Sequence, residues 1–184
     1  RTGEAMEYLD RVIAEEAGYR SPVVSALENG FLRVELCAHT EDYATAIKTI
    51  EELDAMLGEV PMMRFFPKYA RIWYYSMAED RDHIAEAEAI LAEIEAIAAK
   101  NPTAGLEAMA LFARAGVHGL REEFGEAAAI AEEAIGLFTM LPQDQRLFLR
   151  AYILGDMHRK AGQLQEAEKE ILAGLELEPS HPFF

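Results

Sequence analysis

Five prolines recur along the chain at nearly constant intervals, and this spacing constrains the fold more than any other feature. Pro22, Pro61, Pro102, Pro142 and Pro182 each lie about 40 residues from the next. Proline is excluded from helix interiors but favoured at the first helical position, so each one can mark the boundary before a new helix. Apolar residues between these boundaries recur at intervals of three and four, which predicts helices. We therefore expect an all-α chain built from a repeating helical unit.

A second set of residues gives the same period. Alternate predicted helices carry a small residue that is followed four residues later by an apolar or small one. These small residues, again about 40 residues apart, are Ala5, Ala46, Ala87, Ala127 and Ala167. Agreement between two registers predicts an α-solenoid of stacked antiparallel helix pairs, because each pair must bury its apolar face against the next. The expected helices span residues 3–18, 22–38, 43–58, 67–80, 83–100, 103–119, 123–140, 143–161 and 164–177.

The expected organisation is one domain, with a half repeat at residues 1–19 and four full repeats at 22–60, 61–101, 102–141 and 142–181. The first predicted helix has the pattern of the second helix of a repeat, and the chain begins with Arg1. We interpret this as a piece, or a processed form, of a longer protein. Apolar residues at the other end, including Phe183 and Phe184, would cap an array poorly and allow self-association through its ends.

The last repeat carries a family pattern. A Leu-Gly pair ends the segment Tyr152–Gly155, a turn glycine and a mid-helix alanine lie in Ala161–Ala167, and Pro179 follows the second helix. In these features the chain resembles a tetratricopeptide repeat, although His158 stands where that family usually has an aromatic residue. Earlier repeats keep part of the pattern. The resemblance implies a right-handed superhelix whose first helices line a concave groove.

The period of about 40 residues exceeds the 34 that is usual for tetratricopeptide repeats, which implies longer helices. In this respect the chain is similar to bacterial tetratricopeptide-like domains with elongated repeats, such as the sensor arms of large ATP-dependent transcription activators. HEAT and armadillo arrays have similarly long periods and are the alternative architecture.

The resemblance also assigns the residues of the groove. An aromatic and aliphatic wall, with Glu79 and Asp80 near its acidic edge, would suit an apolar or basic peptide segment. Family members that grip an acidic tail carry Lys, Asn and Arg at these positions, so an anionic tail is disfavoured here. The alternative is that some of the aromatic residues belong to the core. The positions are Glu28, Phe31, Glu35, Tyr69, Ile72, Ser76, Met109, Phe112, Gly116, Leu149, Tyr152, Asp156 and Arg159.

Charge and composition exclude several other classes. The chain has 17 Lys and Arg residues against 33 Asp and Glu residues, a formal net charge of -16, which would repel a nucleic-acid backbone. Its apolar runs are shorter than the roughly 18 residues needed to span a membrane. Cys37 is the only cysteine, so an intrachain disulfide or a cysteine zinc site cannot form. A cytoplasmic location is expected, or a periplasmic one if a signal peptide was removed.

The sequence contains no motif of a nucleotide-binding loop, a zinc protease or a nucleophile elbow, so we expect no enzyme activity and no cofactor. Three histidines, His39, His118 and His158, fall at or near the ends of predicted first helices, where the helix dipole favours them. We expect no metal site, because no local pair of ligands accompanies them. Adjacent acids such as Glu132 and Glu133 face different directions and are expected on the surface.

The leading functional hypothesis is a protein interaction scaffold that holds a peptide or a helical segment in the groove. The alternatives are a ligand-sensing arm of a bacterial transcription regulator and a self-assembling scaffold. The apolar segment Met62–Phe66 has two interpretations as well. It either covers neighbouring helices or contacts a partner.

Overall fold

The structure is a computed structural model that describes residues 22–138 and 149–177, together with Glu4, residues 6–9, Arg11, Arg146 and Leu147. Every regular element in these residues is helical, which confirms the predicted all-α class. Within the same residues, no helix is both long enough and apolar enough to cross a membrane. The helices fall into two compact units, Arg1–Ile97 and Ala98–Phe184, and each is described by itself.

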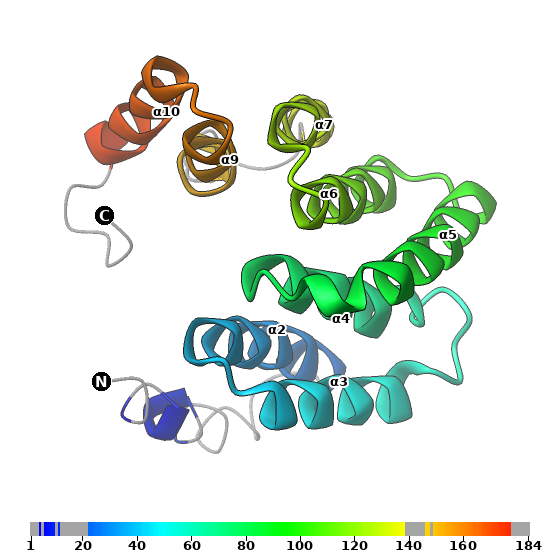
Figure 1. Cartoon of the computed structure of the whole chain (residues 1–184). Helices are drawn as coiled ribbons and strands as arrows, with labels where there is room; N and C mark the ends of the chain where they lie inside the picture. The colour runs from blue at the N-terminus through cyan, green and yellow to red at the C-terminus, as the bar shows by residue number, and fades with distance from the viewer. Residues whose placement is uncertain are drawn as a thin grey trace. The chain divides into compact units, whose positions relative to one another are not determined.

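The first unit contains α2 (Pro22–Thr40), α3 (Tyr43–Leu57), α4 (Phe65–Met77), a 3₁₀ turn (Arg81–His83) and α5 (Ile84–Lys100), whose last residues belong to the second unit. Helix α2 packs against both α3 and α4, and α3 also packs against α4 (Figure 1). Two ion pairs join α4 to α5 in antiparallel order: Arg71 Nη1 lies 2.9 Å from Glu86 Oε1, and Lys68 Nζ lies 2.7 Å from Glu93 Oε2.

The second unit contains α6 (Ala104–Leu120), α7 (Phe124–Leu137), a π-helical segment (Arg150–Leu154), α9 (Gly155–Lys160) and α10 (Leu164–Leu177). Helices α6 and α7 form one hairpin, and the π-helical segment continues directly into α9, which forms a second hairpin with α10 (Figure 1). Helix α7 contacts both the π-helical segment and α9, so the two hairpins of this unit pack against each other.

Most of the predicted helices agree with the structure to within three residues, and two of the differences have physical reasons. The helix expected at 67–80 is α4, which begins at Phe65 because this side chain is fully buried at 0% exposure and anchors the start of the helix. The helix expected at 143–161 contains the π-helical segment, which helical periodicity does not predict. Most of the helix expected at 3–18, and residues 139–145, lie outside the described residues.

Four hairpin turns in the described residues have one backbone geometry. Each has a residue in the left-handed conformation, and the next residue donates its amide hydrogen to the carbonyl five residues before it, over 2.8 to 3.0 Å. This hydrogen bond closes a helix end by satisfying a carbonyl that the helix itself leaves unpaired. The left-handed residues are Glu41, Glu79, Glu122 and Gly162, with φ of 55°, 52°, 62° and 74°. Their spacing of about 40 residues agrees with the predicted period.

The small residues of the second predicted register are buried wherever the structure describes their side chains. Ala46, Ala87 and Ala127 have 0% exposure, and Ala167 has 4%. A close helix contact accompanies the last of them: a Cβ atom placed on Gly155 would lie 2.9 Å from Ile171 Cγ1 and 3.8 Å from the Ala167 carbonyl oxygen. The close approach of α9 and α10 therefore depends on the missing side chain of Gly155.

We predict that Gly155→Leu destabilises the protein by about 1 to 3 kcal/mol, because the added side chain must push α10 away from α9. The measurement is the free energy of unfolding from urea denaturation followed by circular dichroism. Gly136→Leu is the matched control, since a Cβ atom at this exposed glycine of α7 would meet nothing within 4 Å. Equal unfolding midpoints for the two variants would contradict the close contact.

Arg150, in the π-helical segment, ties this segment to two other helices. Its Nε and Nη2 atoms donate to Glu170 Oε2 at 2.8 Å and Oε1 at 2.7 Å, so the guanidinium holds the carboxylate of α10 with two bonds. Nη2 also donates to Glu132 Oε1 of α7 at 3.1 Å. The Glu170 hydrogen bonds and, less strongly, the Glu132 bond raise the pKa of Arg150, and burial opposes them. The Glu170 side chain is only 8% exposed, and its two bonds to Arg150 satisfy both carboxylate oxygens.

We predict that Glu170→Ala destabilises the protein by about 1 to 3 kcal/mol, because charged hydrogen bonds are lost and a partly buried guanidinium loses its main partner. Glu132→Ala removes the other carboxylate, which is 60% exposed, and is expected to cost at most about 1 kcal/mol. Thermal and urea unfolding of both variants measure the difference. A larger loss for Glu132→Ala than for Glu170→Ala would refute this assignment.

Candidate functional site

Three partly exposed aromatic rings on α2 and α4 form what we call the aromatic surface: Phe31, Tyr69 and Trp73. The centroid of the Phe31 ring lies 5.7 Å from that of Tyr69, and the rings are tilted by 60°. Tyr69 stacks on Trp73, one helical turn later, at 6.2 Å and on buried Phe65, one turn earlier, also at 6.2 Å. The i, i+4 spacing along α4 aligns these three rings, and the packing of α2 on α4 adds Phe31.

Glu35 supplies negative charge next to this surface. It follows Phe31 by one turn on α2 and is partly exposed. Burial, and then the charge of Glu35, raise the pKa of the Tyr69 hydroxyl above its ordinary value of 10.0. The hydroxyl therefore remains protonated at neutral pH and keeps its ability to donate a hydrogen bond. The surface combines flat apolar area with an acidic group.

The remaining predicted groove residues of the first unit have different environments. Ile72 is only 1% exposed and belongs to the core, where it supports the helix that carries Tyr69 and Trp73. Ser76 and Asp80 are partly exposed, and Glu79 is exposed in the hairpin turn after α4. Glu28 lies on α2, and its side chain is outside the described part of the structure.

The predicted groove residues of the second unit also divide between core and surface. Met109, Leu149 and Tyr152 are partly exposed, whereas Gly116 is buried. Phe112 is only 7% exposed, and its ring stacks on Phe138 at 5.8 Å, just after the end of α7. Asp156 Oδ1 accepts a hydrogen bond from Arg159 Nη2 at 2.6 Å, and Asp156 Oδ2 lies 3.0 Å from Lys160 Nζ. The acidic and basic groups predicted here thus neutralise each other.

The apolar segment Met62–Phe66 contains both buried and exposed residues. Phe65 is completely buried, which fits the interpretation that the segment covers neighbouring helices. Arg64 Nε donates to the Gly58 carbonyl oxygen at 2.5 Å and holds the segment against the end of α3. Met62 is 44% exposed, and it is near in sequence to two other exposed apolar residues, Met56 and Val60. The partner-contact interpretation therefore applies only to the first part of the segment.

A histidine stacked on two tyrosines is a feature that the sequence did not predict. The centroid of the His83 ring lies 4.8 Å from that of Tyr75, with an interplanar angle of 9°, and 5.6 Å from that of Tyr43, with an angle of 21°. Its Nδ1 atom lies 2.9 Å from Asp80 Oδ2 in the turn between α4 and α5. Tyr43 lies at the start of α3, far from His83 along the chain, so no local pattern in the sequence predicts this cluster.

The surroundings of His83 favour its charged form. The close contact with the Asp80 carboxylate raises the pKa of His83 above 6.5, the charges of Asp80, Glu86 and Asp82 raise it further, and desolvation opposes them. Glu86 is itself paired with Arg71 of α4. The two tyrosine faces also favour an imidazolium, because aromatic rings attract a cation above their plane.

We predict that the stability of the first unit falls as the pH rises, because His83 loses its proton. Because the folded-state pKa lies above the unfolded value, its contribution is fully present below about pH 6.5 and is lost as the pH rises through the folded-state pKa. Urea unfolding at pH 5.5, 7 and 8.5 should show a decline that is smaller in His83→Gln. His39→Gln, at an exposed histidine of α2, should keep the decline. An unchanged decline in His83→Gln would exclude His83 as its source.

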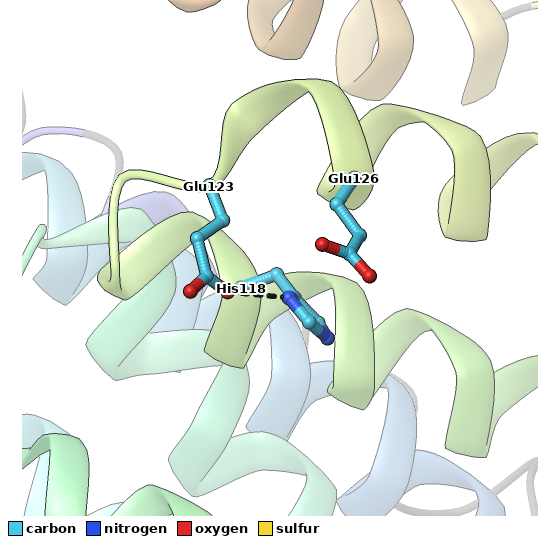
Figure 2. A group of neighbouring side chains, drawn as sticks. All are labelled: His118, Glu123 and Glu126. Carbon is cyan, nitrogen blue, oxygen red and sulfur yellow. Dashed lines mark hydrogen bonds and ion pairs between the residues drawn. The ribbon is translucent and has the colours of Figure 1, made fainter.

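A second cluster lies at the turn between α6 and α7. Figure 2 shows His118 of α6, Glu123 in the turn and Glu126 in the first turn of α7, with the imidazole and both carboxylates directed into the same space. His118 Nδ1 and Glu123 Oε2 are 2.7 Å apart, and one donor atom from each of the three residues lies within 4.8 Å of the others. The sequence did not predict this group, because its members are five and three residues apart, across a helix end.

Comparisons of the chain with protein-family models, with curated proteins and with solved structures found no match.

Proposed function

We propose that this chain is a protein interaction module: a right-handed, tetratricopeptide-like solenoid that binds an apolar or basic peptide or helical segment through its first helices. The observation that carries the proposal is the aromatic surface, where Phe31 and Tyr69 meet at 5.7 Å beside Glu35. The repeated hairpin turns and the close contact at Gly155 support the tetratricopeptide-like architecture.

The rings of the aromatic surface are suited to binding. Tyr and Trp bury a large area while immobilising few rotatable bonds, and for this reason they dominate the binding energy of many interfaces. Stacking between Tyr69 and its neighbours orders the rings before a partner arrives, which lowers the entropy lost on binding. Buried Phe65 and Ile72 support them from the core.

Charge favours a cationic partner. The chain has a formal net charge of -16, so its field accelerates the approach of basic segments and opposes that of nucleic acid. Glu35 is placed to contact a Lys or Arg side chain whose stem lies across Tyr69. A partner that presents an apolar residue next to a basic one would use both features of the surface.

The test is selection of binding peptides from a random displayed library with the whole chain as bait. We predict that selected peptides combine aromatic or large aliphatic residues with Lys or Arg. Phe31→Ala and Tyr69→Ala are each expected to weaken binding of the best peptide by about 1 to 3 kcal/mol, measured by calorimetry. Glu35→Gln is expected to slow association and to reduce the salt dependence of the association rate.

Leu32→Ala is the matched control, because Leu32 is adjacent to Phe31 on α2 and is itself 41% exposed. It points away from Phe31 around the helix and should leave binding unchanged. Circular dichroism confirms that each variant is folded. If the selected peptides bind Phe31→Ala and Tyr69→Ala as tightly as the original chain, the aromatic surface is not the binding site.

A further inference from the structure

The turn between α6 and α7 brings together three groups of metal-ligand type on a rigid hairpin. His118 offers an imidazole nitrogen, and Glu123 and Glu126 offer two carboxylates, with donor atoms all within 4.8 Å of one another (Figure 2). Tetrahedral zinc with ligands at about 2.1 Å needs donors about 3.4 Å apart. The pair His118 Nδ1 and Glu123 Oε2 is already closer, at 2.7 Å. Both glutamates are exposed, so rotation of their side chains can provide the remaining adjustment.

The backbone fixes the positions from which these groups extend. Glu123 donates its amide hydrogen to the His118 carbonyl oxygen at 2.9 Å, in the hairpin turn that follows the left-handed residue Glu122. Glu126 lies in the first turn of α7 and faces the same side as Glu123. A cation at this point must displace one competitor, since Arg121 Nη1 lies 3.9 Å from the same Glu123 oxygen. The Arg121 side chain is 40% exposed.

The next hairpin contains almost the same arrangement with one ligand changed. His158 Nδ1 lies 2.7 Å from Gln163 Oε1, and Glu166 occupies the first turn of α10 as Glu126 does in α7. Gly162 has the left-handed conformation that Glu122 has in the first turn. An amide oxygen is a weak ligand for transition metals, whereas a carboxylate is a good one. The second hairpin therefore has the histidine and one of the two carboxylates, and lacks only the carboxylate that Glu123 supplies in the first hairpin.

We propose that the α6–α7 turn is a binding site for a divalent transition-metal ion of the zinc class, held by His118, Glu123 and Glu126. An imidazole ligand favours such ions over Mg²⁺ and Ca²⁺, which prefer oxygen donors alone. The ion neutralises two carboxylates that otherwise repel each other and replaces the hydrogen bond between His118 and Glu123. Three protein ligands leave one position for water, so the site can hold the ion and also accept a ligand from a partner.

The competing explanation is that the His118–Glu123 hydrogen bond only closes the turn. The His158–Gln163 hydrogen bond closes the next turn in the same way, with a neutral glutamine in place of the glutamate. The two explanations differ in what Glu123→Gln does. That variant copies the second turn, where the histidine keeps a 2.7 Å contact to glutamine, so the fold should be preserved. A turn-closing bond would survive the change, but a metal site would lose a ligand.

The experiment is titration of the whole chain with Zn²⁺ by calorimetry at pH 7.4, in a buffer that does not bind zinc. We expect micromolar binding that millimolar Mg²⁺ or Ca²⁺ does not displace, and a rise in thermal unfolding temperature on zinc addition. Glu123→Gln should weaken this binding at least tenfold. Gln163→Glu should complete the second turn and increase the number of zinc ions bound by one, a gain that loss of folding cannot produce.

Imidazole NMR signals identify the ligand directly, because zinc should shift the resonances of His118 and not those of His158. In Gln163→Glu, the resonances of His158 should shift as well. Absence of zinc binding by the original chain, or equal binding by Glu123→Gln, would overturn the proposal. Zinc binding that leaves the resonances of His118 unshifted would also overturn it, and the His118–Glu123 pair would then be a turn-closing contact only.

Discussion

The hydrogen bond that closes each hairpin turn is the interaction on which the other described features depend. It runs from the residue after the left-handed one to the carbonyl five residues earlier, and it occurs after α2, α4, α6 and α9. It fixes where a first helix ends and where its partner begins, so that buried small residues such as Ala127 and Ala167 meet the preceding helix. At Gly162 the left-handed conformation is easily adopted, whereas Glu41, Glu79 and Glu122 adopt it at a cost of about 1 to 2 kcal/mol each.

Because this bond always joins the same two positions, it also brings together the side chains at these positions. The carbonyl belongs to Cys37, Tyr75, His118 and His158 in turn, and the amide belongs to Asp42, Asp80, Glu123 and Gln163. One backbone geometry thus presents different chemistry at successive turns. At Asp42, hydrogen bonds from Thr45 lower the pKa of the carboxyl as it caps α3. Asp80 pairs with a stacked histidine, and the third turn gathers three ligand-type groups.

The sequence predicted the helices well because local rules determine them. The periodic prolines mark where the chain turns, and the periodic alanines mark where helices touch. Most predicted helix ends agree with the structure to within three residues. The π-helical segment is tied to other helices through Arg150, and the early start of α4 accompanies the burial of Phe65, and no local window of sequence contains either feature. The predicted groove included Phe31, Glu35 and Tyr69, and the structure brings the rings of Phe31 and Tyr69 together. The sequence could not show that Ile72 and Phe112 are almost fully buried, because burial also depends on neighbouring helices. The stacking of Tyr43 on His83 joins two segments that are distant along the chain and was equally beyond it.

The stacking of Trp73 on Tyr69 gives the aromatic surface its own optical reporter. Trp73 is the chain's single tryptophan, so all of the indole fluorescence of the protein originates at this surface. The wavelength and quantum yield of its emission depend on water contact and on the Tyr69 ring stacked 6.2 Å away. A ligand that covers the two rings or separates them changes both quantities. Events at the aromatic surface can therefore be followed in the unlabelled chain.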